Sequence, residues 1–128
     1  MRLLLDVNVL IAAGNAGHAD HARTLRWIAG LNRPQFLTSP ITELGFVRIT
    51  VANALQPNVR TAITALERWK SATKTQLVSD GLGAARLPAW ANTAAKTTDG
   101  HLLALAQAHG AELATLDRGI PGALLIPA

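Results

Sequence analysis

The 128-residue chain contains no cysteine, no tyrosine, and only two phenylalanines and three tryptophans. The absence of cysteine excludes disulfides, thiolate metal ligands and cysteine nucleophiles, and it is compatible with a reducing cytosol. The scarcity of aromatic residues argues against a platform on which the bases of a single strand stack. No apolar run approaches the roughly 20 residues of a membrane span. We therefore expect a soluble, cytoplasmic protein with no membrane association.

The motifs of several common enzyme classes are also missing. The chain has no glycine-rich phosphate loop, no nucleophile elbow, no His-Glu-x-x-His pattern and no dinucleotide fingerprint after its first apolar run. The opening residues 1–5 superficially suggest a secretory signal, but Asp6 and Asn8 would interrupt the apolar core that such a signal requires. These absences exclude the enzyme classes that depend on those motifs.

Negative charge is scarce as well. Only eight residues are acidic, against 12 Lys and Arg, and the formal net charge is +4. Half of the acidic residues stand where an ordinary globular sequence would not place a carboxylate: Asp6, Glu43, Asp99 and Asp117. Without these four, the rest of the chain is strongly basic, which suits a polyanionic substrate held by metal ions. Any nucleic acid would be bound mainly through its phosphates.

Apolar runs alternate with amphipathic segments along the chain, which predicts an α/β fold with a mostly parallel sheet. The length and the 49% hydrophobic content suit one domain with its own core, over residues 1–128. Strands are predicted at residues 2–6, 35–38, 75–79, 111–116 and 123–126. Helices are predicted at residues 8–13, 18–31, 40–53, 57–71 and 99–109. The helix at 18–31 should carry Ala22, Leu25, Ile28 and Ala29 on one face, and residues 81–97 are the least regular part.

Asp6 and Asp117 each close a predicted strand. Parallel strands end at one edge of a sheet, where open α/β proteins bind their ligands, so topology alone brings these two carboxylates to the same edge. Taken singly, three of the acids have a structural alternative. Asp6 could cap the next helix, Asp99 could cap its helix or face the helix dipole, and Asp117 could initiate a turn. For these three residues the choice between structure and function stays open.

Glu43 is harder to explain by structure alone. Ser39 is the predicted N-cap of its helix, and the acid of a capping box would then stand at position 42 rather than 43. No basic residue lies one turn away on the same helix, and an unsatisfied Glu on an apolar face is costly. Glu67, in contrast, has Lys70 one turn away and is expected to be a solvated surface charge. A functional role is therefore favoured for Glu43.

Histidines and basic residues are weaker candidates. His18 and His21 share a predicted helix face and could ligate a transition metal, but no third ligand is evident, so surface histidines are the simpler interpretation. Six basic residues could contact phosphates, although an ordinary solvated face is the favoured explanation for each of them: Arg23, Arg26, Arg48, Arg60, Arg68 and Lys70.

Four segments, in this order and spacing, resemble the PIN-domain ribonucleases, and the closest group is the VapC toxins of bacterial toxin–antitoxin pairs. The segments are residues 4–10, 39–48, 98–102 and 108–117. The resemblance implies a three-layer α/β/α sandwich around a mostly parallel sheet of about five strands. It also implies that the four acids Asp6, Glu43, Asp99 and Asp117 are catalytic and bind metal, and that Asn8 is an accessory polar residue.

The same resemblance implies a function: a metal-dependent endoribonuclease that acts as the toxin of a type II pair, with a cognate antitoxin protein as partner and a homodimer as the assembly. Oxygen ligands suit Mg²⁺ or Mn²⁺, which can activate a water and stabilise the leaving oxygen of an RNA phosphodiester. Gly100 departs from the usual preference for helix formers in a first turn, and we expect it to loosen the approach to Asp99. Residues 81–97 carry no recognisable signature.

Three other functions stay open. A housekeeping PIN nuclease in RNA processing or decay would share the chemistry, but its induced expression would be harmless. A receiver-like domain or an aspartyl phosphohydrolase fits less well, because the last lysine is Lys96 and Asn8 occupies the second acidic position of an Asp-x-Asp motif. A catalytically silent α/β binding domain would bind neither Mg²⁺ nor Mn²⁺.

Overall fold

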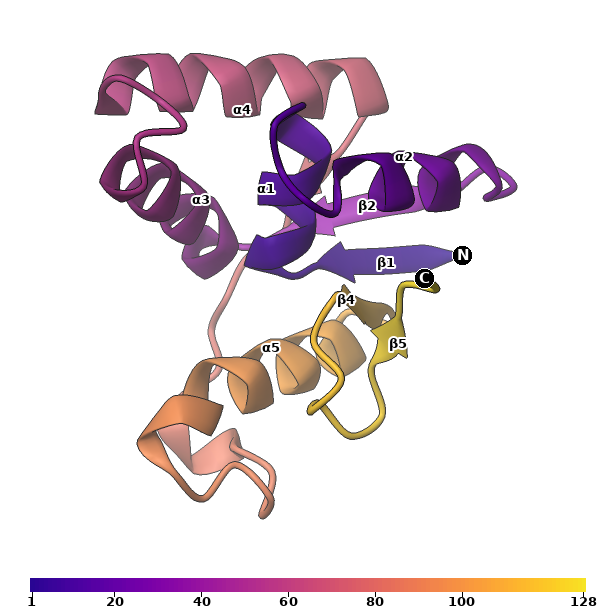
Figure 1. The fold of residues 1–128 in the computed structure, drawn as a ribbon. Helices are drawn as coiled ribbons and strands as arrows, with labels where there is room; N and C mark the ends of the chain where they lie inside the picture. The colour runs from indigo at the N-terminus through magenta and orange to yellow at the C-terminus, as the bar shows by residue number, and fades with distance from the viewer.

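The computed structural model describes all 128 residues and contains one five-stranded sheet in the order β3-β2-β1-β4-β5 (Figure 1). The strands are β1 (Arg2–Leu5), β2 (Gln35–Thr38), β3 (Gln76–Leu77), β4 (Glu112–Thr115) and β5 (Leu124–Leu125). Every neighbouring pair is parallel, and Leu4 of β1 lies opposite Leu37 of β2 and Leu113 of β4. The predicted α/β fold with five parallel strands is confirmed, although β3 and β5 are shorter than expected.

Helices cover both faces of this sheet (Figure 1). Four of them, α1 (Val7–Gly14), α2 (His21–Ala29), α3 (Pro40–Ala52) and α4 (Val59–Thr73), lie on one side, and α5 (Thr97–Ala108) lies on the other. Residues 81–97 hold only two short 3₁₀ turns, η1 (Ala84–Arg86) and η2 (Ala94–Lys96). None of the helices has the length and apolar character needed to cross a membrane.

Two hydrophobic cores hold the three layers together. Side chains of a strand alternate between the two faces, so Leu3 and Leu5 pack beneath the four-helix layer while Leu4 packs against α5. All three leucines are almost fully buried, and each such side chain contributes roughly 1.5–3 kcal/mol relative to an exposed one. The central strand β1 is therefore fixed on both faces, together with the residue that follows it, Asp6.

The helix ends follow the local sequence closely. Ser39 caps α3 and Thr42 completes a capping box, which explains why no acid is needed at that position. The helix predicted from Pro57 begins instead at Val59, because Asn58 accepts a hydrogen bond from the backbone of Thr61 and caps α4. Gly110 follows α5 with φ +63°, in the left-handed conformation expected after a helix C-terminus.

The predicted inward face of the second helix is confirmed at Ile28 but wrong at Ala22, Leu25 and Ala29, which are exposed. α2 begins at His21 rather than His18, and Trp27 and Ile28 pack against the core. Thr24 is consequently the buried residue of this helix, while Leu25 is 42% exposed. Apolar residues lie on both faces of this helix, so the sequence pattern alone did not show which face is buried.

Gly100 has a different role from the one expected. It is buried in α5, and a Cβ atom built there would lie 2.5 Å from the Cβ of Ala91 and 3.2 Å from Cδ of Pro88. A glycine is required because the irregular segment before α5 packs directly on the helix backbone. Gly100 therefore tightens the packing around the start of α5 and does not loosen it.

Candidate metal centre

The site lies where the sheet changes its direction of growth. From β1 the chain adds β2 and β3 on one side, and it later returns to add β4 and β5 on the other. Ligands of open α/β sheets bind beyond the strand ends at such a switch point. Asp6 follows β1 and Asp117 follows β4, so they flank this point from the two central strands.

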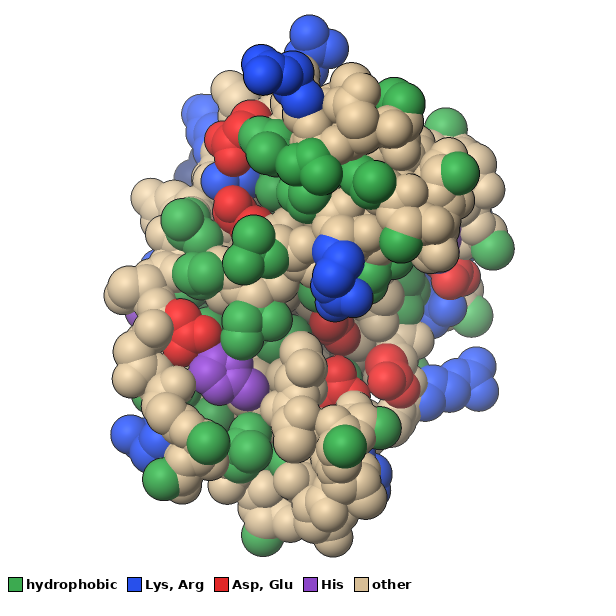
Figure 2. All heavy atoms as spheres, turned by 90° about the vertical axis from the view of Figure 1, so that its left-hand side faces the viewer, with side chains coloured by type: hydrophobic (Ala, Val, Ile, Leu, Met, Phe, Trp, Pro, Cys, Tyr) green, Lys and Arg blue, Asp and Glu red, His purple; other side chains and the backbone are tan.

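A pocket of about 410 Å³ opens there. Its lining includes four residues that the sequence assigned to the site, Asp6, Asn8, Asp99 and Asp117, and the neighbour of Asp99 in the chain, Thr98. His18 and Arg48 also line it. The structure thus brings three of the four singled-out acids into one pocket, together with Asn8. On the face drawn in Figure 2, acidic side chains lie in several separate places, and one group of them surrounds a hollow beside basic atoms.

Asp6 is held rigidly by its neighbours. Its Oδ1 accepts a hydrogen bond from the backbone N–H of Val7 at 2.7 Å, and its Oδ2 accepts one from Oγ1 of buried Thr115 at 2.8 Å. Burial raises the pKa of Asp6, the two hydrogen bonds act against this shift, and the charge of Asp117 adds to it. Asp6 therefore does cap α1, as its structural alternative required, and it also contributes a carboxylate to the pocket.

Asn8 and Thr115 connect the two central strand ends. The Asn8 amide accepts a hydrogen bond from the backbone N–H of Leu116 at 3.2 Å and donates one to Thr115 at 3.4 Å. The Thr115 hydroxyl also accepts the backbone N–H of Asp117 at 3.0 Å. Asn8 thus helps to fix the chain between Thr115 and Asp117, and its accessory role in the site stays a prediction.

Asp99 and Asp117 are less constrained. Asp99 is the third residue of α5 and does not cap it, but it lies in the first turn, where the alternative of an acid facing the helix dipole placed it. Partial burial raises the pKa of Asp99, and the charges of Asp6 and Asp117 raise it further. Asp117 accepts the backbone N–H of Gly119 at 2.8 Å through Oδ1, which is the turn that its structural alternative predicted. The three carboxylates therefore repel one another across the pocket.

Glu43 does not line the acidic pocket. Its Oε2 lies 2.8 Å from Nζ of Lys70 on α4 and accepts a hydrogen bond from Oγ1 of Thr38 at 2.5 Å. Burial lowers the pKa of Lys70, but hydrogen bonds and charge from Glu43 and Glu67 outweigh this effect, and the net pKa is raised. As the sequence indicated, Glu43 has no basic partner one turn away on α3, but Lys70 of a different helix supplies one. Its role in the site stays a prediction.

The donor atoms fit a divalent cation that prefers oxygen. Carboxylate and amide oxygens suit Mg²⁺ or Mn²⁺ better than Zn²⁺, and such a charge would relieve the mutual repulsion that raises the pKa of Asp99. As the side chains stand, no group of three or more His, Cys, Asp or Glu residues is arranged so that it could hold an ion. Side-chain rotations would therefore have to accompany binding.

Three residues near the acids were missed by the sequence analysis or only weakly indicated by it. Thr115 carried no signal, since a threonine at the end of a strand is ordinary. His18 was assigned to a surface helix, but it precedes α2 and accepts a hydrogen bond from the backbone N–H of Asp20 at 3.0 Å. Arg48 was one basic residue among several, and only the packing of α3 brings it to the pocket.

Fold and site together define a class of small α/β/α domain with carboxylates gathered at the switch point of a parallel sheet. The chain belongs to the PIN domain family, whose family model matches residues 3–122. Ribonuclease VapC44 of Mycobacterium tuberculosis is 36% identical over 130 residues, which cover 94% of this chain and 89% of the relative. Ribonuclease VapC39 of the same organism is 33% identical over 129 residues, covering 94% and 91%. The resemblance to VapC proteins is confirmed.

Solved structures agree on the fold. The crystal structure of Mycobacterium tuberculosis VapC20, described as a sarcin-ricin loop cleaving toxin, matches with a TM-score of 0.68 at 15% identity, over 98% of this chain and 99% of that one. A toxin–antitoxin complex from Klebsiella pneumoniae matches with a TM-score of 0.63 at 23% identity, over 98% of each chain. At these identities the likeness establishes the three-layer fold alone.

Proposed function

We propose that the chain is a divalent-metal-dependent endoribonuclease and the toxin of a type II toxin–antitoxin pair. The observation that carries the proposal is the grouping of Asp6, Asp99 and Asp117 in one pocket at the switch point. The pKa values of Asp6 and Asp99 are raised, and Asp117 uses only Oδ1 in its turn. None of the three forms an ion pair with a basic side chain. The names of the VapC relatives support RNA as the substrate.

Asp6, Asp99 and Asp117 would hold Mg²⁺ or Mn²⁺, and we propose that Glu43 joins them when its carboxylate leaves Lys70. Lys70 would stay paired, because Glu67 lies 3.2 Å from the same ammonium group. When bound, the cation supplies an activated water and charge stabilisation for the leaving oxygen. Thr115 and the backbone N–H of Val7 orient the Asp6 carboxylate throughout.

Positive charge at the rim would position the RNA backbone. Arg48 and His18 both line the acidic pocket. Arg48 is exposed and His18 is half-buried. An Arg fork binds phosphate oxygens well, and Nε2 of His18 stays available because its Nδ1 accepts the N–H of Asp20. We propose that these side chains contact the phosphates on either side of the cleaved bond.

The proposed partner is supported by neighbouring proteins. VapBC2 of Rickettsia felis and the toxin–antitoxin complex of Klebsiella pneumoniae share the fold. They support a cognate antitoxin as the partner of this chain, and a homodimer is the assembly we propose. A housekeeping nuclease would share the pocket, so the toxin role needs its own test: induced expression should arrest growth, and the antitoxin should relieve the arrest.

The nuclease activity is tested with total cellular RNA. We expect the wild-type protein to produce defined new 5′ ends with Mg²⁺ or Mn²⁺ and none with a chelator. Asp99→Asn should remove the cleavage while the protein stays folded. Asp20→Asn is the matched control, since Asp20 pairs with Arg23 outside the pocket, and it should cleave normally. Cleavage that survives the chelator, or full activity of Asp99→Asn, contradicts the proposal.

A further inference from the structure

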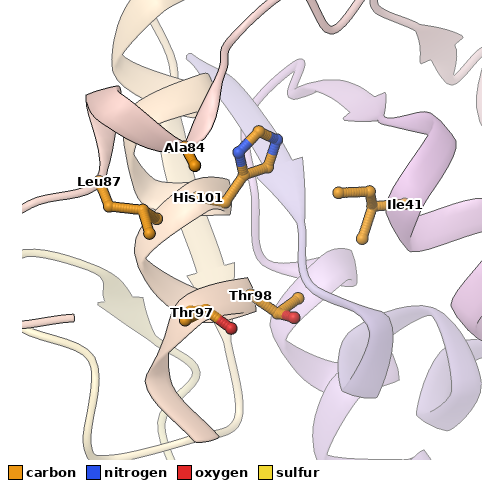
Figure 3. A pocket seen from close by; sticks show the side chains of 6 residues that line it. All are labelled: Ile41, Ala84, Leu87, Thr97, Thr98 and His101. Atoms are coloured by element: carbon orange, nitrogen blue, oxygen red, sulfur yellow. The ribbon is translucent and has the colours of Figure 1, made fainter. Parts of the chain in front are cut away.

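A second hollow, of about 250 Å³, lies beside the acidic pocket, and Figure 3 shows the side chains that line it. Six residues from the start of α3, from η1 and from the first turns of α5 line it: Ile41, Ala84, Leu87, Thr97, Thr98 and His101. Thr98 lines the acidic pocket as well, so the two hollows share a wall. Whatever occupies the acidic pocket is thus directly adjacent to this space.

His101 forms one wall of the hollow and is held in place from behind. Its Nε2 lies 2.6 Å from Oδ2 of Asp80, and the two side chains are only 15% and 11% exposed. The other oxygen of Asp80 accepts the backbone N–H of Leu82 at 3.2 Å. In Figure 3 the imidazole stands between Ala84 and Ile41. Because Asp80 takes Nε2, the ring offers its flat face and Nδ1 to a ligand.

The remaining lining combines apolar and hydroxyl groups. Ile41 is 38% exposed and gives the hollow an accessible apolar side. The hydroxyl of Thr97 donates to the carbonyl of Ala94 at 2.9 Å, whereas the hydroxyl of Thr98 makes no hydrogen bond within the chain. No Lys or Arg lines the hollow, so it favours an uncharged group over a phosphate.

The size of the hollow suits one heterocycle. Pockets for drug-sized ligands span about 300–1,000 Å³, and at about 250 Å³ this hollow suits a smaller group. Sequence-specific RNA proteins splay out single-stranded bases, stack them on aromatic side chains including histidine, and read their polar edges. The packing of Ala91 and Pro88 on Gly100 holds the segment that carries Ala84 and Leu87 against α5, so the hollow is formed before any ligand arrives.

We propose that this hollow, named here the base pocket, binds one nucleobase of the RNA next to the cleaved phosphodiester. The base stacks on His101 and forms hydrogen bonds with Nδ1 of His101 or the hydroxyl of Thr98. The proposal rests on the proposed function, because it assumes that the neighbouring phosphate occupies the acidic pocket. It assigns base selection at one position of the cut to η1 and α5, within the region whose role the sequence left open.

Binding is tested without metal or catalysis. The four nucleoside 5′-monophosphates are titrated into ¹⁵N-labelled protein with a chelator present, and backbone amide shifts are followed. We expect one base to bind preferentially and to shift the amides of Ala84, Leu87, Thr98 and His101. Ala84→Leu should fill the pocket and weaken this binding tenfold or more. Ala85→Leu, one residue further in the same exposed turn and outside the lining, should change it less than twofold.

Cleavage gives an independent readout with an RNA pool randomised around the cut. Wild type and Ala85→Leu should share one base preference, which Ala84→Leu and Leu87→Ala should lose. Shifts that map elsewhere, or a preference unchanged in both lining variants, overturn the base pocket. So does a result in which these variants impair only antitoxin binding. Failure of the proposed function is distinct: wild type would then hydrolyse neither RNA nor the base-free diester bis(4-nitrophenyl) phosphate with Mn²⁺, whether or not nucleotides bind.

Discussion

Replacing Lys70 by methionine removes the cation that holds Glu43 while it keeps a side chain of similar length. Lys70 and Glu43 are 13% and 17% exposed, whereas Glu67 is 58% exposed. An exposed ion pair contributes about 0.2–1 kcal/mol, and breaking a fully buried one costs about 3–5 kcal/mol. The Glu43–Lys70 pair lies between these limits. We therefore expect Lys70→Met to lower the free energy of unfolding of the metal-free protein by about 1–3 kcal/mol.

The same substitution should act on cation binding in the opposite direction. With Lys70 present, a cation has to compete with the ammonium group for the Glu43 carboxylate. Removing a competition of about 1 kcal/mol corresponds to roughly fivefold tighter Mg²⁺ binding. Glu43→Gln, which removes the carboxylate itself, should instead weaken the binding.

Urea denaturation and calorimetric Mg²⁺ titration measure the two effects separately. Glu67→Gln is the control, because its exposed pair should change stability by less than about 1 kcal/mol and leave Mg²⁺ affinity unchanged. Equal weakening of Mg²⁺ binding by Lys70→Met and Glu43→Gln would refute the competition. An unfolding free energy unchanged in Lys70→Met would refute the estimate for the ion pair.

Three further substitutions test the surroundings of the acids. The folded-state pKa of Asp99 is raised, so the folded metal-free protein binds this proton more tightly than the unfolded chain does. Its stability should therefore fall as the pH rises from about 4 through that pKa. Asp99→Asn should flatten this pH dependence and add about 0.5–1 kcal/mol to the free energy of unfolding at pH 7; an unchanged pH profile in urea denaturation would count against this reasoning. Thr115→Val removes a hydrogen bond that lowers the pKa of Asp6, so the carboxyl ¹³C titration midpoint of Asp6 should move upward. A midpoint that stays or falls would contradict the role of Thr115 in positioning the Asp6 carboxylate. Gly100→Ala should lower the Tm, since overpacking against Ala91 costs about 1–3 kcal/mol and helix propensity returns at most about 1 kcal/mol; a raised Tm would show that the segment yields.

Much of the fold was predictable because it depends on local patterns. Short apolar runs ending in polar residues marked β1 and β4, and Ser39 with Pro40 marked the start of α3. Errors arose where several packing solutions shared one pattern. Leu25 looked like a core residue, but Trp27 competes for the same core and determines how α2 is rotated.

The site was predictable only in part, for a related reason. Asp6 and Asp117 could be brought together from topology, since both follow strands of one parallel sheet. The partner of Glu43 could not, because Lys70 lies on another helix and only the packing of α3 on α4 brings the two together. The same holds for Asp80, which meets His101 across the irregular segment. Long-range contacts between polar side chains leave no periodic signal in a single sequence.

The most direct test of the central claim is paramagnetic broadening of backbone amides by Mn²⁺. The account predicts that substoichiometric Mn²⁺ broadens the amides around Asp6, Asp99 and Asp117 first, and that excess Mg²⁺ restores them. In Asp99→Asn the effect should require much more Mn²⁺, while the amides on the far end of α4 stay sharp in both proteins. Broadening centred elsewhere, or none at all near these three acids, would contradict a metal centre at the carboxyl edge of the sheet.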